Sequence, residues 1–319
     1  MAEVNIPLLD LADFKSGTEE QRKKFSQDLG KAFNATGFVT VKNHGLSQQL
    51  MDNTYKEVKK VFALSDDQKH SYEIVELAGQ RGYTSKGREK AKGALTPDLK
   101  EFWQVGQTVT DADPIKKEYP ENIVVSELPE FNQITREVYS TLEDAGKYLL
   151  RAIALYLNLE ENYFDNKIHN GNSILRAIHY FPILDVENLS PDAVRAGAHE
   201  DINLITLLIG ASADGLQLLT KEGEWFPITA REDHIVVNVG DMLQRLTNNK
   251  LSSTTHRVVN PPKELLGTSR YSVPFFLHPR SSMDLSCLDS CIDSNGKHYE
   301  DITAGEYLDE RLREIGLKA

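Results

Sequence analysis

Apolar side chains in the first half of the chain recur mainly with the spacing of an α-helix. After a short apolar run at residues 6–9, Thr18 and Gln21 form a capping-box pattern ahead of an apolar stripe, which predicts the start of a helix. A short β run follows at residues 37–41. Two further stripes predict a second and a longer third helix, with apolar positions at Leu50, Met51, Tyr55, Val58 and Phe62, then at Phe131, Ile134, Val138, Leu142 and Leu149.

From about residue 173 the pattern changes to short apolar or alternating runs separated by polar turns. Such runs occur at residues 204–209, 215–219, 234–239, 256–259 and 271–276. Several strands at this spacing predict a β-sandwich or barrel. Residues 303–317 return to a helical period. Because the chain has no repeat and no obvious linker, we expect one domain in which a helical N-terminal half wraps a β core.

Composition and charge narrow the class of protein. Hydrophobic residues make up 40% and charged residues 26% of the chain, as in ordinary soluble globular proteins. The net charge of −12 disfavours general binding to nucleic acid or to anionic membranes, because like charges repel. The first residues lack the basic start and apolar stretch of a signal peptide, and Cys287 and Cys291 are too few for a disulfide framework. We therefore expect a cytoplasmic protein.

One short motif has the form of a metal site. His199 and Asp201 open the run that leads to residue 209, and side chains two apart on a strand point to the same face. The pair alone is a weak signal, and His298 with Glu300 repeats it after a predicted turn. His256 lies in another predicted strand and supplies a third ligand. Two histidines and a carboxylate form the facial triad of non-haem iron(II) oxygenases, although a zinc hydrolase could use the same set.

A second motif indicates an anion clamp. Arg270 and Ser272 stand at the head of the strand that follows His256, again on one face. A guanidinium binds a carboxylate through two parallel hydrogen bonds and a hydroxyl adds a third, so the pair suits the distal carboxylate of a dicarboxylic acid. Arg280 and Ser282 have the same spacing in an apparent loop. The ordered set of three ligands and a clamp on successive strands is far more specific than either motif alone.

These motifs resemble one known family. The chain is similar to the isopenicillin N synthase-like branch of the iron(II)/2-oxoglutarate-dependent dioxygenase superfamily, and the similarity covers nearly the whole sequence. The segments that carry it are His199-Glu-Asp-Ile-Asn-Leu-Ile-Thr206, Asn238-Val-Gly-Asp-Met-Leu-Gln244, Leu246-Thr-Asn-Asn249, Thr255-His-Arg-Val-Val-Asn260, Arg270-Tyr-Ser-Val-Pro-Phe-Phe276 and, nearer the N-terminus, Ile6-Pro-Leu-Leu-Asp10, Gly37-Phe-Val39, Asn43-His-Gly45 and Gly82-Tyr83.

The resemblance implies a fold and an activity. The fold would be mainly β with flanking helices: an N-terminal helical region at residues 1–165 and a double-stranded β-helix (jelly-roll) core with a C-terminal helix at residues 166–319, packed as one structural unit. Iron(II) would bind His199, Asp201 and His256. Arg270 and Ser272 would hold 2-oxoglutarate, and O2 would be the second co-substrate. The expected activity is oxidation, usually hydroxylation, of a C–H bond in a small molecule, with release of succinate and carbon dioxide.

Two alternatives stay open at this point. An iron oxidase that does not use 2-oxoglutarate, similar to isopenicillin N synthase, would turn the same arginine and serine toward its own substrate. A catalytically silent protein that binds a small acid could share the fold, although it would not need three open metal positions. In either case we expect a monomer or a homodimer.

The remaining candidates concern the pocket. His179 and Tyr180 stand near the segment that the family uses close to the co-substrate, so either is a candidate contact to 2-oxoglutarate. The candidates for the substrate pocket are Phe38, Arg81, Tyr83, Trp103 and Phe276, and ordinary core packing is the competing interpretation for each aromatic residue. The loop at residues 79–93 is basic and glycine-punctuated, which is compatible with a mobile lid or with a plain solvated connection. Such a loop fits a small anionic metabolite.

Overall fold

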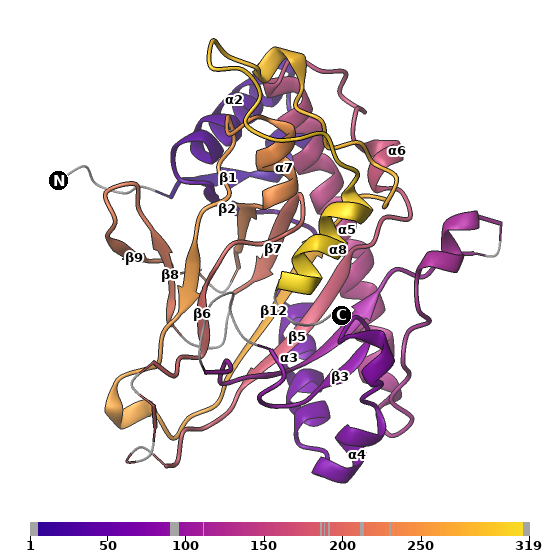
Figure 1. The fold of residues 1–319 in the computed structure, drawn as a ribbon, viewed down its shortest axis with the longest axis vertical. Helices are drawn as coiled ribbons and strands as arrows, with labels where there is room; N and C mark the ends of the chain where they lie inside the picture. The colour runs from indigo at the N-terminus through magenta and orange to yellow at the C-terminus, as the bar shows by residue number, and fades with distance from the viewer. Residues whose placement is uncertain are drawn as a thin grey trace.

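The computed structural model contains two β-sheets that face each other, flanked by helices (Figure 1). It describes residues 6–89, 96–110, 112–185, 187, 189–190, 192–210, 214–229, 231 and 233–314. The large sheet has eight strands, in the order β1 (Leu8–Asp10), β2 (Phe38–Lys42), β10 (Ile235–Val239), β7 (Ile205–Ile209), β12 (Arg270–Leu277), β5 (Ile174–Tyr180), β4 (Glu101–Gly106) and β3 (Gly82–Thr84). The small sheet has four, in the order β6 (Ala196–His199), β11 (His256–Val258), β8 (Leu216–Leu219) and β9 (Trp225–Pro227).

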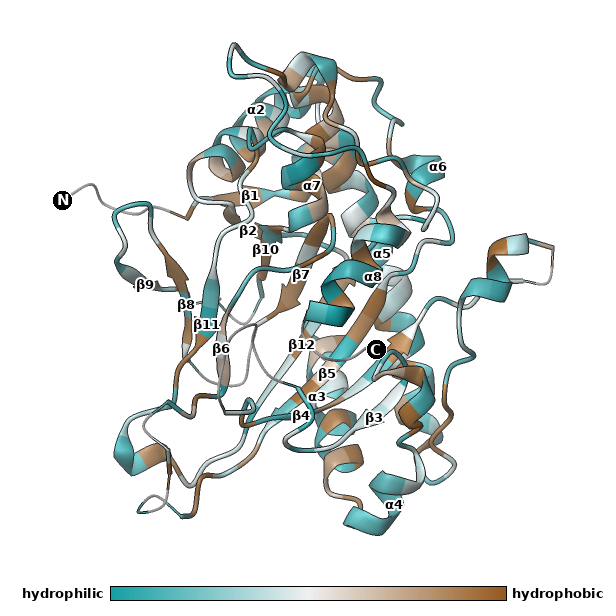
Figure 2. Cartoon of the chain, in the orientation of Figure 1, coloured by the Kyte–Doolittle hydropathy of each residue, from teal (hydrophilic) through white to brown (hydrophobic). Residues whose placement is uncertain are grey.

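Strand pairing is antiparallel except between β1 and β2. The alternation of side chains sends one set of residues to each face of the large sheet. One face packs on the helices in a large apolar core, and the other faces the small sheet across a second cluster that includes Phe38, Phe102 and Ile178. β7 is hydrophobic along most of its length because both of its faces are covered (Figure 2).

Three long helices cover the outer face of the large sheet: α2 (Glu19–Ala35), α3 (Gln48–Phe62) and α5 (Pro129–Tyr156). The predicted capping box is present, since Thr18 accepts from the Gln21 amide and Gln21 accepts from the Thr18 amide. The shorter helices are α1 (Leu11–Lys15), α4 (Asp66–Ser71), α6 (Asp165–Ile168), α7 (Asp241–Leu246) and α8 (Ala304–Glu314), with 3₁₀ turns at Val75–Leu77, Pro114–Glu118, Lys263–Leu265 and Asp289–Cys291. No described helix combines the length and the apolar character needed to cross a membrane.

The hydrophobic pattern predicted the β-rich second half and the three long helices of the first. Its predicted strand runs did not include β3, β4, β5, β6 or β9. Every residue of β4 is buried, so the strand lacks the alternation of polar and apolar side chains by which a half-exposed strand is recognised. β4 lies beside β5, and its residue Gln104 lines the cavity described below.

Candidate metal centre and substrate cavity

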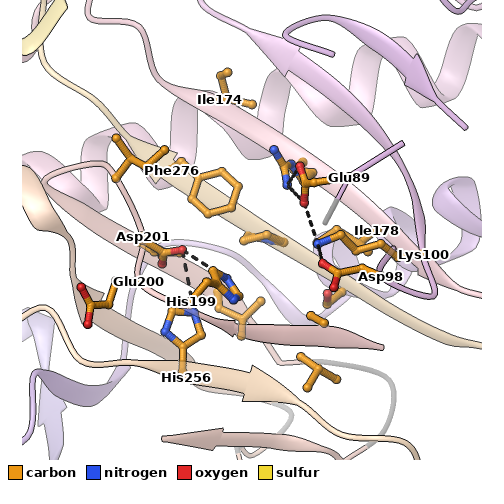
Figure 3. A pocket seen from close by; sticks show the side chains of 18 of the residues that line it. Glu89, Asp98, Lys100, Ile174, Ile178, His199, Glu200, Asp201, His256 and Phe276 are labelled. Carbon is orange, nitrogen blue, oxygen red and sulfur yellow. Dashed lines mark hydrogen bonds and ion pairs between the residues drawn. The ribbon is translucent and has the colours of Figure 1, made fainter. Parts of the chain in front are cut away.

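His199, Asp201 and His256 converge at the end of the small sheet. His199 ends β6 and His256 begins β11, and the two residues are direct partners in the ladder that joins these strands. Each histidine Nε2 lies 3.8 Å from Asp201 Oδ1, and all three ligand atoms lie within 4.8 Å of one another (Figure 3). The structure therefore brings together the three residues that the sequence selected, but not on the predicted strand, because His199 ends β6 and Asp201 lies in the segment that leads to β7.

Backbone carbonyls set the orientation of both imidazoles. Nδ1 of His199 lies 2.8 Å from the Gly197 carbonyl oxygen, and Nδ1 of His256 lies 3.1 Å from that of Thr254. Because a carbonyl only accepts, each Nδ1 carries the proton and each Nε2 keeps its lone pair for a metal. Burial and the neighbouring His256 lower the pKa of His199 to about 4, so its ring is neutral at physiological pH.

The Asp201 carboxylate is also oriented by hydrogen bonds, in this case from side chains. Oδ2 of Asp201 accepts hydrogen bonds from the Thr206 hydroxyl (2.6 Å) and the Asn238 amide (2.8 Å), on β7 and β10 of the large sheet. Burial opposes ionisation, but the two histidines and these hydrogen bonds together hold the pKa of Asp201 below its ordinary value. Oδ1 is left to face the histidines. Two neutral imidazoles and one carboxylate suit iron(II) well, and their common face leaves the cavity side open.

The cluster forms one wall of a cavity of about 440 Å³ between the sheets. Arg270, Ser272 and Tyr180 line the same cavity from β12 and β5. Arg270 pairs with Tyr180 across the strands, its guanidinium lies 4.8 Å from the centre of the tyrosine ring, and its Nε donates to the Asp214 carbonyl (3.2 Å). A buried arginine and a serine hydroxyl in one cavity with the cluster fit a dicarboxylic acid such as 2-oxoglutarate.

His179 lies on the other face of β5. Its ring stacks on Tyr271 at 4.7 Å, and its nitrogens contact Glu101 (2.7 Å) and Ser269 (2.9 Å). Lys69 adds an ion pair to Glu101 at 3.0 Å. This buried network joins three strands to α4 behind the cavity, so the structure does not bring His179 to the proposed co-substrate position. Neighbouring residues of a strand face opposite ways, which is why Tyr180 lines the cavity.

Of the five pocket candidates, Phe276 lines the cavity, and the other four do not. Phe38 packs edge-on against His256 with ring centres 5.8 Å apart, and Trp103 packs edge-on against Phe131 in the core. Tyr83 donates to Glu101, and the guanidinium of Arg81 lies buried against Gly106. These four side chains belong to the packing around the site, as the competing interpretation held for the aromatic residues.

Sequence reasoning missed a group of four charged residues in the cavity. Lys100 Nζ lies 2.6 Å from Glu89 and 2.8 Å from Asp98, and Arg176 Nη1 lies 3.2 Å from Glu89. We refer to Glu89, Asp98, Lys100 and Arg176 as the charged wall, and Figure 3 labels the first three of them. Glu89, Asp98 and Lys100 precede β4 in the sequence and Arg176 lies on β5, so no local pattern groups these four residues.

The basic loop borders this wall. Gln80 and Glu89 line the cavity, and Gly82–Thr84 form β3. Residues 90–93 of the suggested lid, Lys90 and Lys92 among them, lie outside the described residues.

The two facing sheets, with a His–Asp–His cluster and a buried arginine–serine pair between them, define the class as a non-haem iron oxygenase with a jelly-roll core. Two family models match the chain: the non-haem dioxygenase in morphine synthesis N-terminal model at residues 6–127 and the 2OG-Fe(II) oxygenase superfamily model at residues 171–279. The chain belongs to the 2OG-Fe(II) oxygenase superfamily.

Relatives of known name support this assignment over the whole length. The proline hydroxylase buaE of Petromyces alliaceus is 30% identical, with 97% of this chain and 99% of the relative covered. A solved 2OG-Fe(II) oxygenase family protein from Caulobacter crescentus superposes with a TM-score of 0.86 at 39% identity, covering 98% of this chain and 100% of that one. A full-length Neurospora crassa protein solved in complex with alpha-KG gives a TM-score of 0.85 at 30% identity, covering 97% of this chain and 98% of that one.

The comparisons confirm the predicted family, the fold class and the cofactors. The protein is an oxidoreductase of the dioxygenase type that uses iron(II) and 2-oxoglutarate. Its mainly β core with flanking helices is the fold that the resemblance implied.

Proposed function

We propose that His199, Asp201 and His256 hold iron(II), and that Arg270 and Ser272 hold the distal carboxylate of 2-oxoglutarate while the protein hydroxylates a C–H bond of a small molecule. The observation that carries this assignment is the meeting of the three ligand atoms within 4.8 Å in the cavity that Arg270 and Ser272 also line. When bound, iron and 2-oxoglutarate supply the activation of O2 that oxidises the substrate, with release of succinate and carbon dioxide.

The protein's own residues position and shield these groups. The neutral imidazoles present their Nε2 lone pairs, and the carboxylate presents Oδ1, each oriented by a hydrogen bond on its other side. Arg270 offers a planar guanidinium that is held against Tyr180. Leu308 and Leu312 of α8 line the cavity, and their apolar side chains limit access of water to the reacting C–H bond.

The size of the cavity and the charge of the chain bear on the substrate, the partners and the cellular location. The cavity suits a small molecule rather than a polymer. The net charge of −12 disfavours nucleic acid and anionic membranes as partners, and the two cysteines are free, which fits a cytoplasmic location. We expect a monomer or homodimer whose residues 1–165 and 166–319 form one structural unit.

Arg270→Met tests the clamp. Anaerobic, iron-loaded protein is titrated with 2-oxoglutarate while the weak visible charge-transfer band of the chelate is followed, and succinate is assayed after O2 is admitted. We expect the variant to need at least about tenfold more 2-oxoglutarate, because a bidentate charged contact is lost.

Arg280→Met is the matched control. Arg280 forms an ion pair with Asp113 at 3.0 Å and does not line the cavity, so its loss should leave the titration unchanged. Unchanged 2-oxoglutarate affinity in Arg270→Met would show that Arg270 is not the clamp. No band in the iron-loaded wild type would contradict the proposed function itself.

A further inference from the structure

The charged wall balances its own charges. Lys100 and Arg176 are paired with Glu89 and Asp98, and all four side chains are largely buried. Burial alone would raise the pKa of Glu89, but Arg176 and Lys100 lower it to about 2, so its carboxylate stays ionised at physiological pH. Two cations and two anions therefore face the cavity with no net charge.

This balance bears on the charge of the substrate. Next to the charged wall, a substrate carboxylate would find Lys100 and Arg176 already paired. It would therefore have to displace Glu89 or Asp98. Placing an anion in a buried site without a counter-ion of its own is strongly unfavourable. An uncharged ligand avoids this cost, which weakens the earlier expectation of an anionic metabolite.

Arg176 still has hydrogen-bonding capacity toward the cavity. Its Nε donates to Gln104 Oε1 at 3.1 Å, and its Nη1 donates to Glu89. Nη2 makes no hydrogen bond within the part of the chain that the structure describes. The guanidinium is fixed in place by stacking at 4.2 Å over Phe102 and at 5.2 Å over Phe276.

His278 adds a second donor. The residue is 8% exposed, it lines the cavity, and its Nδ1 is buried with no partner among the described residues. Burial lowers the pKa of His278 to about 4, so the ring is neutral and carries one proton. A buried N–H without an acceptor is costlier than an unfilled lone pair, so the proton belongs on Nε2, which is left to face the cavity.

We propose that the part of the cavity lined by Arg176 and His278 binds an uncharged substrate with carbonyl oxygens, such as an amide, lactam or cyclic imide. The N–H groups of these two side chains would donate to the carbonyl oxygens. Phe276 and Ile174, which line the cavity beside them, take the apolar part of the molecule (Figure 3). The inference rests on the proposed function and names the substrate class for that site.

Matched probe pairs test the charge preference. Iron-loaded protein with saturating 2-oxoglutarate is titrated anaerobically, by calorimetry, with uracil against uracil-6-carboxylate and with 2-pyrrolidinone against 5-oxopyrrolidine-2-carboxylate. We expect the uncharged member of a pair to bind at least about tenfold more tightly. Tighter binding of the carboxylates, or no binding of either uncharged probe at millimolar concentration, would overturn the proposal.

Two variants locate the binding. His278→Phe should weaken binding of the uncharged probe by about tenfold and leave the affinity for 2-oxoglutarate within about twofold, whereas His278→Gln, which keeps an N–H donor, should retain most of the binding. His298→Phe makes the same change on an exposed side chain and should alter neither affinity. An undiminished probe affinity in His278→Phe would exclude His278 as a donor.

Glu89→Gln provides an independent measurement if His278→Phe does not fold. Removing this carboxylate leaves the wall with a net positive charge, so the carboxylated probe should gain at least about tenfold in affinity. No gain would contradict the charge-balance argument. A separate assay distinguishes failure of the proposed function. Iron-loaded protein without any probe should slowly convert 2-oxoglutarate to succinate, and the absence of this conversion would count against the proposed function rather than against the substrate class.

Discussion

Each side chain of the His–Asp–His cluster is oriented by a hydrogen bond on the side away from the proposed metal position. For the two histidines the acceptor is a carbonyl two residues earlier, at Gly197 and Thr254, so the local chain conformation sets the tautomer. For Asp201 the donors are side chains of the opposite sheet. The carboxylate is therefore the ligand whose geometry depends most on how the two sheets face each other.

Thr206→Val tests this dependence at the scale of a single residue. The substitution keeps the shape of the side chain and removes the 2.6 Å hydrogen bond to Asp201 Oδ2. We expect iron affinity to fall by roughly 10- to 100-fold, because partners behind a metal ligand set its orientation and basicity. Competition with a chelator of known affinity measures the change.

Thr135→Val is the control for that substitution. Its hydroxyl donates to the Phe131 carbonyl at 2.8 Å within α5, in the apolar core. It should lower the free energy of unfolding by roughly 1 kcal/mol and leave iron affinity unchanged. Equal iron affinities in wild type and Thr206→Val would show that Thr206 only stabilises the fold.

Among the elements, the turn between α2 and β2 supports the strand that carries His256. Gly37 in this turn has a φ of +73°, and a Cβ there would lie 2.3 Å from the Ser252 carbonyl oxygen and 2.6 Å from Thr254 Oγ1. Thr254 in turn donates to the Thr36 carbonyl (2.8 Å), and its own carbonyl orients His256. The N-terminal region thus helps to position a residue of the metal cluster.

Gly37→Ala should therefore affect both stability and the metal centre. We expect the free energy of unfolding to fall by more than about 2 kcal/mol, because the positive φ and the clash with the backbone of Ser252 add together. Iron affinity should also fall, since residues 252–254 must move. Urea unfolding and chelator competition measure the two effects.

Gly87→Ala separates the effect of the positive φ from the effect of the clash with Ser252. Gly87 also has a positive φ, of +79°, but a Cβ there would meet nothing within 4 Å. This variant should lose only about 1 kcal/mol and keep full iron affinity. A similar loss of iron affinity in both variants would argue against a specific link from Gly37 to His256.

At the scale of the whole molecule, the large sheet takes strands from both parts of the chain. β1 and β2 form one edge, β3 and β4 form the other, and the strands between them come from the second half. α5 covers the outer face of this shared sheet. Neither part can complete its core without the other.

A cooperative transition is the expected consequence. The full chain should unfold in one step in urea, with the same midpoint by far-ultraviolet circular dichroism and by tryptophan fluorescence. A fragment of residues 166–319 should fail to fold, because it would expose both the helix-facing side and new edges of the large sheet. Two separate transitions, or a fragment that folds and binds iron, would show that the parts are independent.

The sequence by itself determined the elements with a clear period and the grouping of residues within one strand. Arg270 and Ser272 lie on β12, so their common face follows from the alternation of side chains, and local spacing was enough to select them. His199 and Asp201 were predicted to open one strand, but His199 ends β6 and Asp201 lies in the segment before β7, so their meeting depends on the course of the chain between the two sheets. The three long helices and the capping box at Thr18 likewise depend on neighbours a few residues apart.

Only the tertiary structure decided what depends on strand register and burial. A shift of one residue exchanges the two faces of a strand, so the sequence could not choose between His179, which lies behind the sheet, and Tyr180, which lines the cavity. The charged wall joins residues from a loop, an unpredicted strand region and β5, and buried charges next to apolar positions have no period to reveal them. The pairing of β4 with β5 within the large sheet brings these side chains together, and such long-range contacts have no counterpart in local sequence.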